Sequence, residues 1–147
     1  MLVAAAAAPA GDLLELPVRR RGGAPQTLAT TLAGAPAVVS VWAVYCPPCR
    51  AEVPILRAAA RRWAPRGVRV VGLAAGFDDE ATMRRTAADW GIDYETFWVG
   101  PTEREALAAL IPAGLPATFL VGSRGIARHD RLLSADELDR LVTAMLE

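Results

Sequence analysis

The chain carries two cysteines, and they stand three positions apart, at Cys46 and Cys49. Residues 37–42, just ahead of them, form a continuous β-rich apolar run, which is typical of a buried central strand. Residues 50–63, just behind them, place apolar side chains at helical spacing. Free backbone N–H groups and the helix dipole stabilise a thiolate at the start of a helix. The pattern therefore predicts a reactive dithiol, with Cys46 as the nucleophile and Cys49 as the resolving thiol.

Other uses of the two cysteines fit the sequence less well. A structural zinc site takes about four ligands, whereas the chain adds only one histidine, His129, far along the sequence. A c-type haem attachment has a histidine directly after the second cysteine, and Arg50 stands there. A structural disulfide over so short a loop would add little stability. We therefore expect redox chemistry without a metal or a cofactor. Pro47 and Pro48 stiffen the first helical turn, where no backbone donor is needed.

Length and composition limit the remaining classes of protein. With 147 residues the chain suits one compact domain. Its formal net charge is zero and its longest basic cluster is the three arginines at 19–21, so nucleic acid is not an expected partner. Residues 1–10 are Ala-rich and end in Ala8-Pro9-Ala10. We interpret them either as a signal-peptide remnant or as a disordered terminus, ahead of one domain at 11–147.

The other segments predict an α/β domain. Further strands are expected at 13–16, 68–74, 94–98, 117–121 and 126–131. Further helices are expected from Asp78 or Asp79 to Trp90, from Thr102 to Leu110 and from Ser134 to Met145. The second and third of these helices begin with capping-box patterns. A βαβ unit followed by a hairpin implies a mixed central sheet with helices on both faces.

With these residues the chain resembles the thioredoxin superfamily, and within it the TlpA/ResA/CcmG-like thiol–disulfide oxidoreductases. The resemblance spans about residues 12–146. It is carried by the cysteine pair with its prolines, the Arg50-Ala-Glu-Val-Pro54-Ile-Leu continuation, the strand beginning at Gly67, and Gly114-Leu-Pro116-Ala-Thr118. It implies the thioredoxin fold and thiol–disulfide exchange.

The resemblance also implies further site residues. Pro116 should follow a cis peptide bond, face the cysteine pair and leave the backbone of Leu115 to pair with an extended peptide. Trp42 and Tyr45 should lie beside the pair and contact the substrate; the family usually has tryptophan at the position of Tyr45. A buried acid or asparagine is common in the family where Ser40 stands, and a serine cannot take up a proton as a carboxylate can. Relatives often also have a glutamate after the strand that follows the active-site helix. The nearest residues here are Asp78, Asp79 and Glu80, which also suit helix capping, and Asp78 is our candidate for handling protons.

The expected function is the reduction of protein disulfides in the periplasm or elsewhere outside the cytoplasm, with cytochrome c maturation as one route. The expected partners are protein substrates and a soluble or membrane electron donor. A monomer is expected, while a membrane tether and a cytoplasmic location stay open. Two alternatives remain: a peroxiredoxin-type thiol peroxidase, although Ala43 replaces the threonine of that pattern, and a non-enzymatic binding or copper-handling module.

Overall fold

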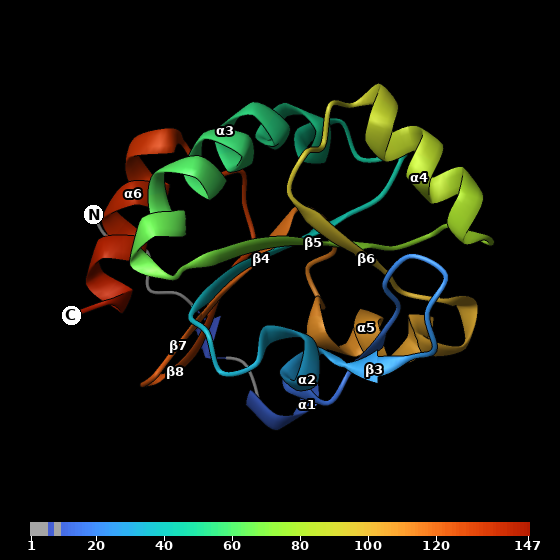
Figure 1. Ribbon diagram of the computed structural model, residues 1–147, viewed down its shortest axis with the longest axis horizontal. Helices are drawn as coiled ribbons and strands as arrows, with labels where there is room; N and C mark the ends of the chain where they lie inside the picture. Colours follow the sequence, from blue (N-terminus) through green and yellow to red (C-terminus); the bar gives the residue numbers. More distant parts are fainter. Residues whose placement is uncertain (1–5, 8–9) are drawn as a thin grey trace.

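Strand β4 (Ala37–Trp42) lies inside a six-stranded sheet with the order β1-β8-β7-β4-β5-β6. The computed structural model describes residues 6–7 and 10–147 (Figure 1). The other strands are β1 (Ala6–Ala7), β5 (Arg69–Ala74), β6 (Glu95–Trp98), β7 (Ala117–Gly122) and β8 (Gly125–His129). Strand β4 runs parallel to β5 and antiparallel to β7, while β5 and β6 are parallel and β7 and β8 form the antiparallel hairpin. The expected mixed sheet is thus confirmed.

Helices cover both faces of this sheet (Figure 1). One face carries α3 (Pro47–Trp63), α4 (Glu80–Asp89) and α6 (Ala135–Met145). The other carries α1 (Ala10–Leu14), α2 (Leu28–Leu32) and α5 (Arg104–Leu110). Short 3-10 turns at Ala64–Arg66 and Pro101–Glu103 follow α3 and precede α5. The expected thioredoxin-like α/β architecture is therefore present.

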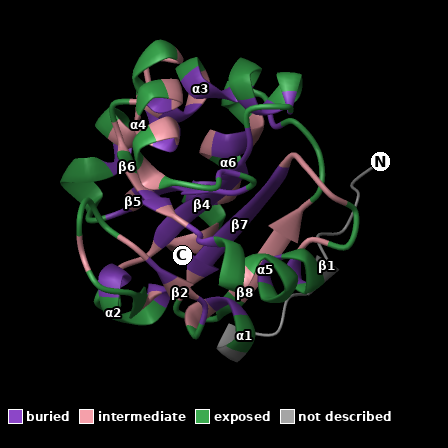
Figure 2. Cartoon of the chain, turned by 90° about the vertical axis from the view of Figure 1, so that its right-hand side faces the viewer, coloured by how far each residue is buried: buried purple, intermediate pink, exposed green. Residues whose placement is uncertain are grey.

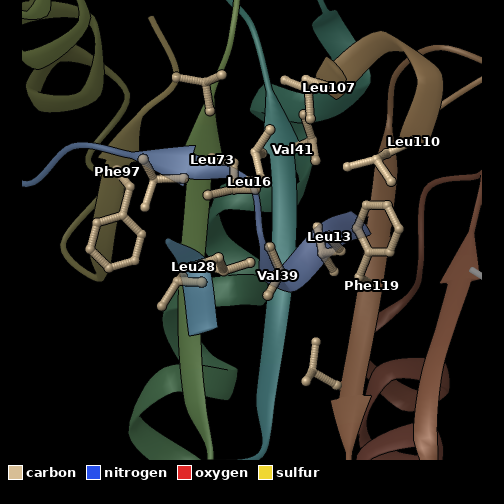
Figure 3. Close-up of a cluster of buried hydrophobic side chains, with 14 of the residues drawn as sticks. Leu13, Leu16, Leu28, Val39, Val41, Leu73, Phe97, Leu107, Leu110 and Phe119 are labelled. Atoms are coloured by element: carbon tan, nitrogen blue, oxygen red, sulfur yellow. The ribbon is translucent and has the colours of Figure 1, made fainter. Parts of the chain in front are cut away.

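Alternate residues of β4 face the two helix layers, so both of its faces are apolar. Val39 and Val41 pack with Phe97 and Phe119 in the core beneath α1, α2 and α5 (Figure 3). Val38 points the other way and packs with side chains of α3 and α6. Figure 2 shows the result: the central strands β4, β5 and β7 are buried, β6 and β8 are mostly of intermediate burial, and the helices are exposed on their outer sides. Burial on both faces explains why the sequence of this strand is a continuous apolar run.

The N-terminal segment covers both outer strands of the sheet. Strand β1 pairs antiparallel with β8. At the other edge Arg19 bridges to Trp98 of β6: its N–H donates to the Trp98 carbonyl (3.0 Å) and its carbonyl accepts from the Trp98 N–H (2.9 Å). On either side of Arg19 in the sequence, β2 (Pro17–Val18) and β3 (Gln26–Thr27) form a small antiparallel ribbon. Residues 1–5, 8 and 9, which belong to the expected signal remnant or Ala-rich terminus, lie outside the described residues.

Two sequence-based predictions of local structure were wrong. Residues 13–16, expected as a strand, instead contain the end of α1 and a turn, because Leu13 and Leu16 both point into the core from one side of that turn. The Thr102 capping box does not form: Pro101 starts a 3-10 turn, the helix begins only at Arg104, and the Thr102 hydroxyl bonds to Glu103. By contrast, the capping box of Ser134 and Glu137 is present at the start of α6.

Candidate active site

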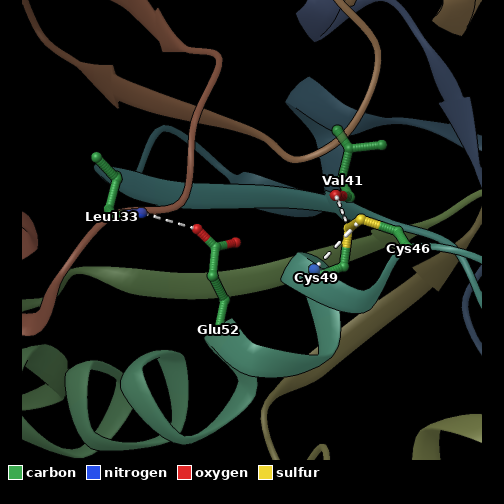
Figure 4. Close-up of a disulfide and its surroundings, with 5 residues drawn as sticks. All are labelled: Val41, Cys46, Cys49, Glu52 and Leu133. Atoms are coloured by element: carbon green, nitrogen blue, oxygen red, sulfur yellow. Dashed lines mark hydrogen bonds between the residues drawn. A yellow bond between two sulfur atoms is a disulfide. The ribbon is translucent and has the colours of Figure 1, made fainter.

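The two cysteines lie where β4 passes into α3. Cys46 is the N-cap residue of the helix, and Pro47 and Pro48 occupy its first positions, where an N–H would have no helical partner. The cysteines form a disulfide (Figure 4). The N–H of Cys49 points to Sγ of Cys46 (3.2 Å), and Sγ of Cys49 lies 3.8 Å from the carbonyl oxygen of Val41. Cys46 thus stands at the positive end of the helix dipole, with a backbone N–H directed at its sulfur.

Aromatic side chains pack behind the disulfide. Trp42 is only 3 % exposed, and its ring lies 5.3 Å from that of Phe77 and 5.1 Å from that of Trp90. The three rings and both cysteines belong to one apolar cluster. The guanidinium of Arg50 covers the Trp90 ring at 5.7 Å. The structure therefore places Trp42 in the interior beneath the cysteines, not on the surface where a substrate would meet them.

A groove of about 520 Å³ opens beside Cys46. Tyr45 is 69 % exposed at its rim, and its ring lies over Gly76, where an added Cβ would come within 2.9 Å of it. The groove brings together four sequence-predicted residues besides Cys46. Its lining comprises Tyr45, Cys46, Pro47, Pro48, Ala75, Gly76, Arg104, Leu107, Ala108, Ile111, Gly114 and Leu115.

The segment ahead of β7 borders the same site. The peptide bond between Leu115 and Pro116 is cis, as the resemblance implied. Leu115 is partly buried and packs against the cluster that contains Cys46 and Cys49. Leu115 therefore borders both the groove and the cluster that contains the cysteines.

Asp78 lies at the surface and forms an ion pair with Arg104 (2.7 Å). Its neighbour Asp79 is the N-cap residue of α4 and accepts from the N–H of Thr82 (2.7 Å). Hydrogen bonds from the N–H and from the hydroxyl of Thr82 lower the pKa of Asp79 below its usual value. In the structure, therefore, Asp78 pairs with Arg104, and Asp79 caps the start of α4.

Glu52 is the acidic residue that the sequence analysis missed. It is 3 % exposed on α3, one helical turn after Cys49. In Figure 4 its carboxylate reaches from the helix toward β4; Oε2 accepts from the N–H of Leu133 (3.2 Å). Oε1 has no hydrogen-bond partner among the described residues. Burial raises the pKa of this carboxyl to about 7, and the Leu133 hydrogen bond offsets part of that rise.

A signal for Glu52 was present in the sequence. Glu52 shares the buried face of α3 with Cys49, Val53 and Leu56, so it is an acid on the apolar stripe of an amphipathic helix. Ser40, at the position where the family often has an acid, is buried on the α3 side of β4. The carboxylate in this chain thus approaches that side of the sheet from the helix rather than from the strand.

Neither a metal site nor a membrane span emerges from the part of the chain that the structure describes. Within residues 6–7 and 10–147, no three His, Cys, Asp or Glu side chains cluster closely enough to hold a metal ion. Over the same residues, the helices are too short or too polar to cross a membrane.

Known proteins similar to this chain are named as thiol–disulfide interchange proteins and oxidoreductases. The model of the AhpC/TSA family matches residues 7–130. Thiol:disulfide interchange protein DsbE of Pseudomonas aeruginosa is 30% identical over 109 residues, which cover 67% of this chain and 51% of that protein. Thiol-disulfide oxidoreductase ResA of Bacillus subtilis is 26% identical over 94 residues, covering 64% and 51%. The chain spans about half the length of these curated relatives.

Solved structures extend the likeness to nearly the whole chain. A secreted Mycobacterium tuberculosis disulfide oxidoreductase, described as homologous to E. coli DsbE, superposes with a TM-score of 0.71 at 26% identity. The match covers 90% of this chain and 98% of that one. The resemblance stated from the motifs is thereby confirmed.

Proposed function

The chain belongs to the AhpC/TSA family, and we propose that it is a thiol–disulfide oxidoreductase that reduces disulfides in other proteins. The observation that carries the proposal is the Cys46–Cys49 pair at the start of α3, with the Cys49 N–H directed at the Cys46 sulfur. In the reduced protein this N–H and the helix dipole favour a thiolate on Cys46. The names of the relatives support the same class of reaction.

The reaction proceeds by two exchanges at sulfur. The Cys46 thiolate attacks a substrate disulfide, forms a mixed disulfide and releases the other substrate sulfur as a thiolate. Cys49 then attacks the Cys46 sulfur, which restores the intramolecular disulfide and releases the second substrate thiolate. Two electrons pass from the protein to the substrate. A dithiol donor, soluble or membrane-bound, must then reduce the protein again.

Glu52 is proposed as the proton acceptor for the second exchange. Cys49 must lose its proton before it attacks, and the carboxylate lies on the same buried helix face. A base works best when its pKa lies near the working pH, and the pKa of Glu52, raised to about 7, meets that condition. Asp78 stays a second candidate from the sequence, and its exposed ion pair with Arg104 gives no support for the role.

The groove beside Cys46 is proposed to bind an extended segment of the substrate protein. Tyr45 and the apolar side chains of α5 would contact that segment, while the Leu115 backbone would pair with it. Apocytochrome c is a candidate substrate. A location outside the cytoplasm is proposed because a disulfide persists there and because the M. tuberculosis relative is described as secreted.

The test is a redox titration of the purified protein in defined thiol–disulfide buffers, with free thiols counted by alkylation and mass spectrometry. We expect one two-electron transition. A potential near about −270 mV supports a reductant, and one near about −120 mV an oxidant. A pair that does not titrate refutes the proposal.

Single-cysteine variants complete the test. Cys46→Ser should abolish turnover, and Cys49→Ser should accumulate mixed disulfides with substrate because nothing resolves them. Equal turnover in Cys46→Ser and the unaltered protein would contradict the assignment. Rapid reduction of peroxide with a thiol donor would instead favour the peroxidase alternative.

A further inference from the structure

A row of small or polar residues crosses the sheet beneath α3. The strand register places Thr118 of β7 opposite Ser40 of β4, and His129 of β8 opposite Thr118. On the other side of Ser40 the row continues through Gly72 of β5 to Thr96 of β6. Residues directly opposite one another on paired strands project from the same face of the sheet. Because Ser40 faces the α3 side, the whole row does so.

Three buried polar atoms of β4, β7 and α3 have no hydrogen-bond partner among the described residues: Nε1 of Trp42, Oγ1 of Thr118 and Oε1 of Glu52. Trp42 Nε1 lies toward Gly72, on the other side of Ser40, whereas Thr118, only 1 % exposed, stands between Ser40 and His129. Buried polar groups nearly always find a partner, often an internal water with two or more polar neighbours. A hydroxyl both donates and accepts hydrogen bonds. Through a bridging water, the Thr118 hydroxyl can therefore be a partner of Glu52 in both its ionised and its protonated form.

The charged surroundings indicate where a proton on Glu52 can go. Titratable or charged residues lie on each element around the row and α3. They are Cys46 at the N-cap of α3, Cys49 within it, Asp93 and Tyr94 before β6, His129 at the end of β8, Asp130 and Arg131 after it, and Glu137 and Asp139 of α6. Burial, followed by the charges of Glu52 and Asp93, raises the pKa of Tyr94, so this phenol keeps its proton.

His129 differs from Tyr94 because either nitrogen of its imidazole can carry the proton. Its side chain is partly exposed at the end of the row. Partial burial first, and then the charge of Arg131, lower the pKa of its imidazole, although Glu137 and Asp130 act in the opposite direction. A neutral imidazole accepts a proton at one nitrogen and releases one from the other.

We propose that Thr118 relays the proton of the exchange reaction between Glu52 and His129, with an internal water bridging Oε1 of Glu52 and Oγ1 of Thr118. The inference rests on the proposed function. When Cys49 gives its proton to the Glu52 carboxylate, the new thiolate forms the bond to Cys46 and the substrate thiolate leaves. The carboxylic acid then passes its proton through the water and the Thr118 hydroxyl to the imidazole, which releases a proton to solvent. Glu52 returns to its carboxylate form and His129 to its neutral form, so both are ready for the next exchange.

The relay is tested by measuring how fast the Glu52 carboxyl exchanges its proton with solvent in the intact oxidised protein. Below pH 7 the protonated carboxyl gives an infrared carbonyl band that shifts when the proton is replaced by deuterium; Glu52→Gln identifies the band by removing it. Rapid mixing with D₂O then times the shift. Thr118→Val should slow the exchange by at least about tenfold, and Thr118→Ser, which keeps the hydroxyl, should restore it.

Thr96→Val is the matched control. Thr96 lies in the same row, but on the opposite side of Ser40 from Thr118 and His129. It should leave the exchange rate unchanged, whereas His129→Gln should slow it as Thr118→Val does. Equal rates in Thr118→Val and the unaltered protein would overturn the proposal, and so would equal slowing by Thr96→Val. If Thr118→Val does not fold, His129→Gln decides the question alone. The measurement needs no substrate, so loss of the relay and failure to reduce disulfides are separate results.

Discussion

Replacing Glu52 with glutamine should remove a large part of the pH dependence of stability. In the unfolded chain this carboxyl has a pKa of 4.5, and burial raises its pKa in the folded protein to about 7. The folded state therefore binds the proton more tightly, so unfolding becomes easier as pH rises through this window. The raised pKa corresponds to about 3 kcal/mol, present below pH 4.5 and lost above pH 7. Glutamine has the same shape and no charge to bury.

Urea unfolding of the oxidised protein at a series of pH values measures this effect. The free energy of unfolding of Glu52→Gln, relative to the unaltered protein, should increase by about 3 kcal/mol between pH 4 and pH 8.5, with an unchanged m-value. Glu105→Gln is the control, since it removes a carboxylate from the exposed side of α5 and should reproduce the unaltered curve. A constant difference between Glu52→Gln and the unaltered protein across this range would refute the reasoning.

Three further predictions concern the core, a helix cap and the redox signal. Phe119→Ala should lower the free energy of unfolding by about 3–5 kcal/mol, because Phe119 is fully buried; a loss below 1 kcal/mol in urea unfolding would contradict the packing described. Ser134→Ala should cost about 1 kcal/mol in the same assay, since its hydroxyl accepts from the Glu137 N–H, and an unchanged stability would show that the cap contributes nothing. Trp42 packs against the cysteine pair, so tryptophan fluorescence should change on reduction of the disulfide and Trp42→Phe should abolish most of that change; an equal change in the variant would place the signal elsewhere.

The fold and the cysteine pair could be predicted because their signals are local in the sequence. The strand at 37–42, the helix start at the cysteines and the capping box at Ser134 each depend on residues within a few positions. The motif around Pro116 likewise predicted the cis bond that the structure contains. Local structure that follows from motif and spacing can therefore be predicted from the sequence.

The helical pattern of α3 indicates that Glu52 faces inward, but its hydrogen-bond partner could not be located in this way, because it comes from a distant part of the chain. The segment after β8 crosses α3 and brings the Leu133 N–H to the carboxylate, 81 positions further along. Trp42 illustrates the same limit: Phe77 and Trp90 hold its ring behind the disulfide, and they come from the segment ahead of α4 and its C-terminal end. The position of Trp42 near the cysteines in the sequence did not reveal that its indole is buried in the interior.

The pairing of Ala6–Ala7 and of Arg19 with the outer strands has a consequence for self-association. An outer strand with free N–H and carbonyl groups is a template on which another chain can add a strand, and extended aggregates grow in that manner. Here β1 occupies part of the outer side of β8, and Arg19 pairs with the Trp98 backbone of β6. These residues thus reduce the backbone of β8 and β6 on which another chain could add a strand.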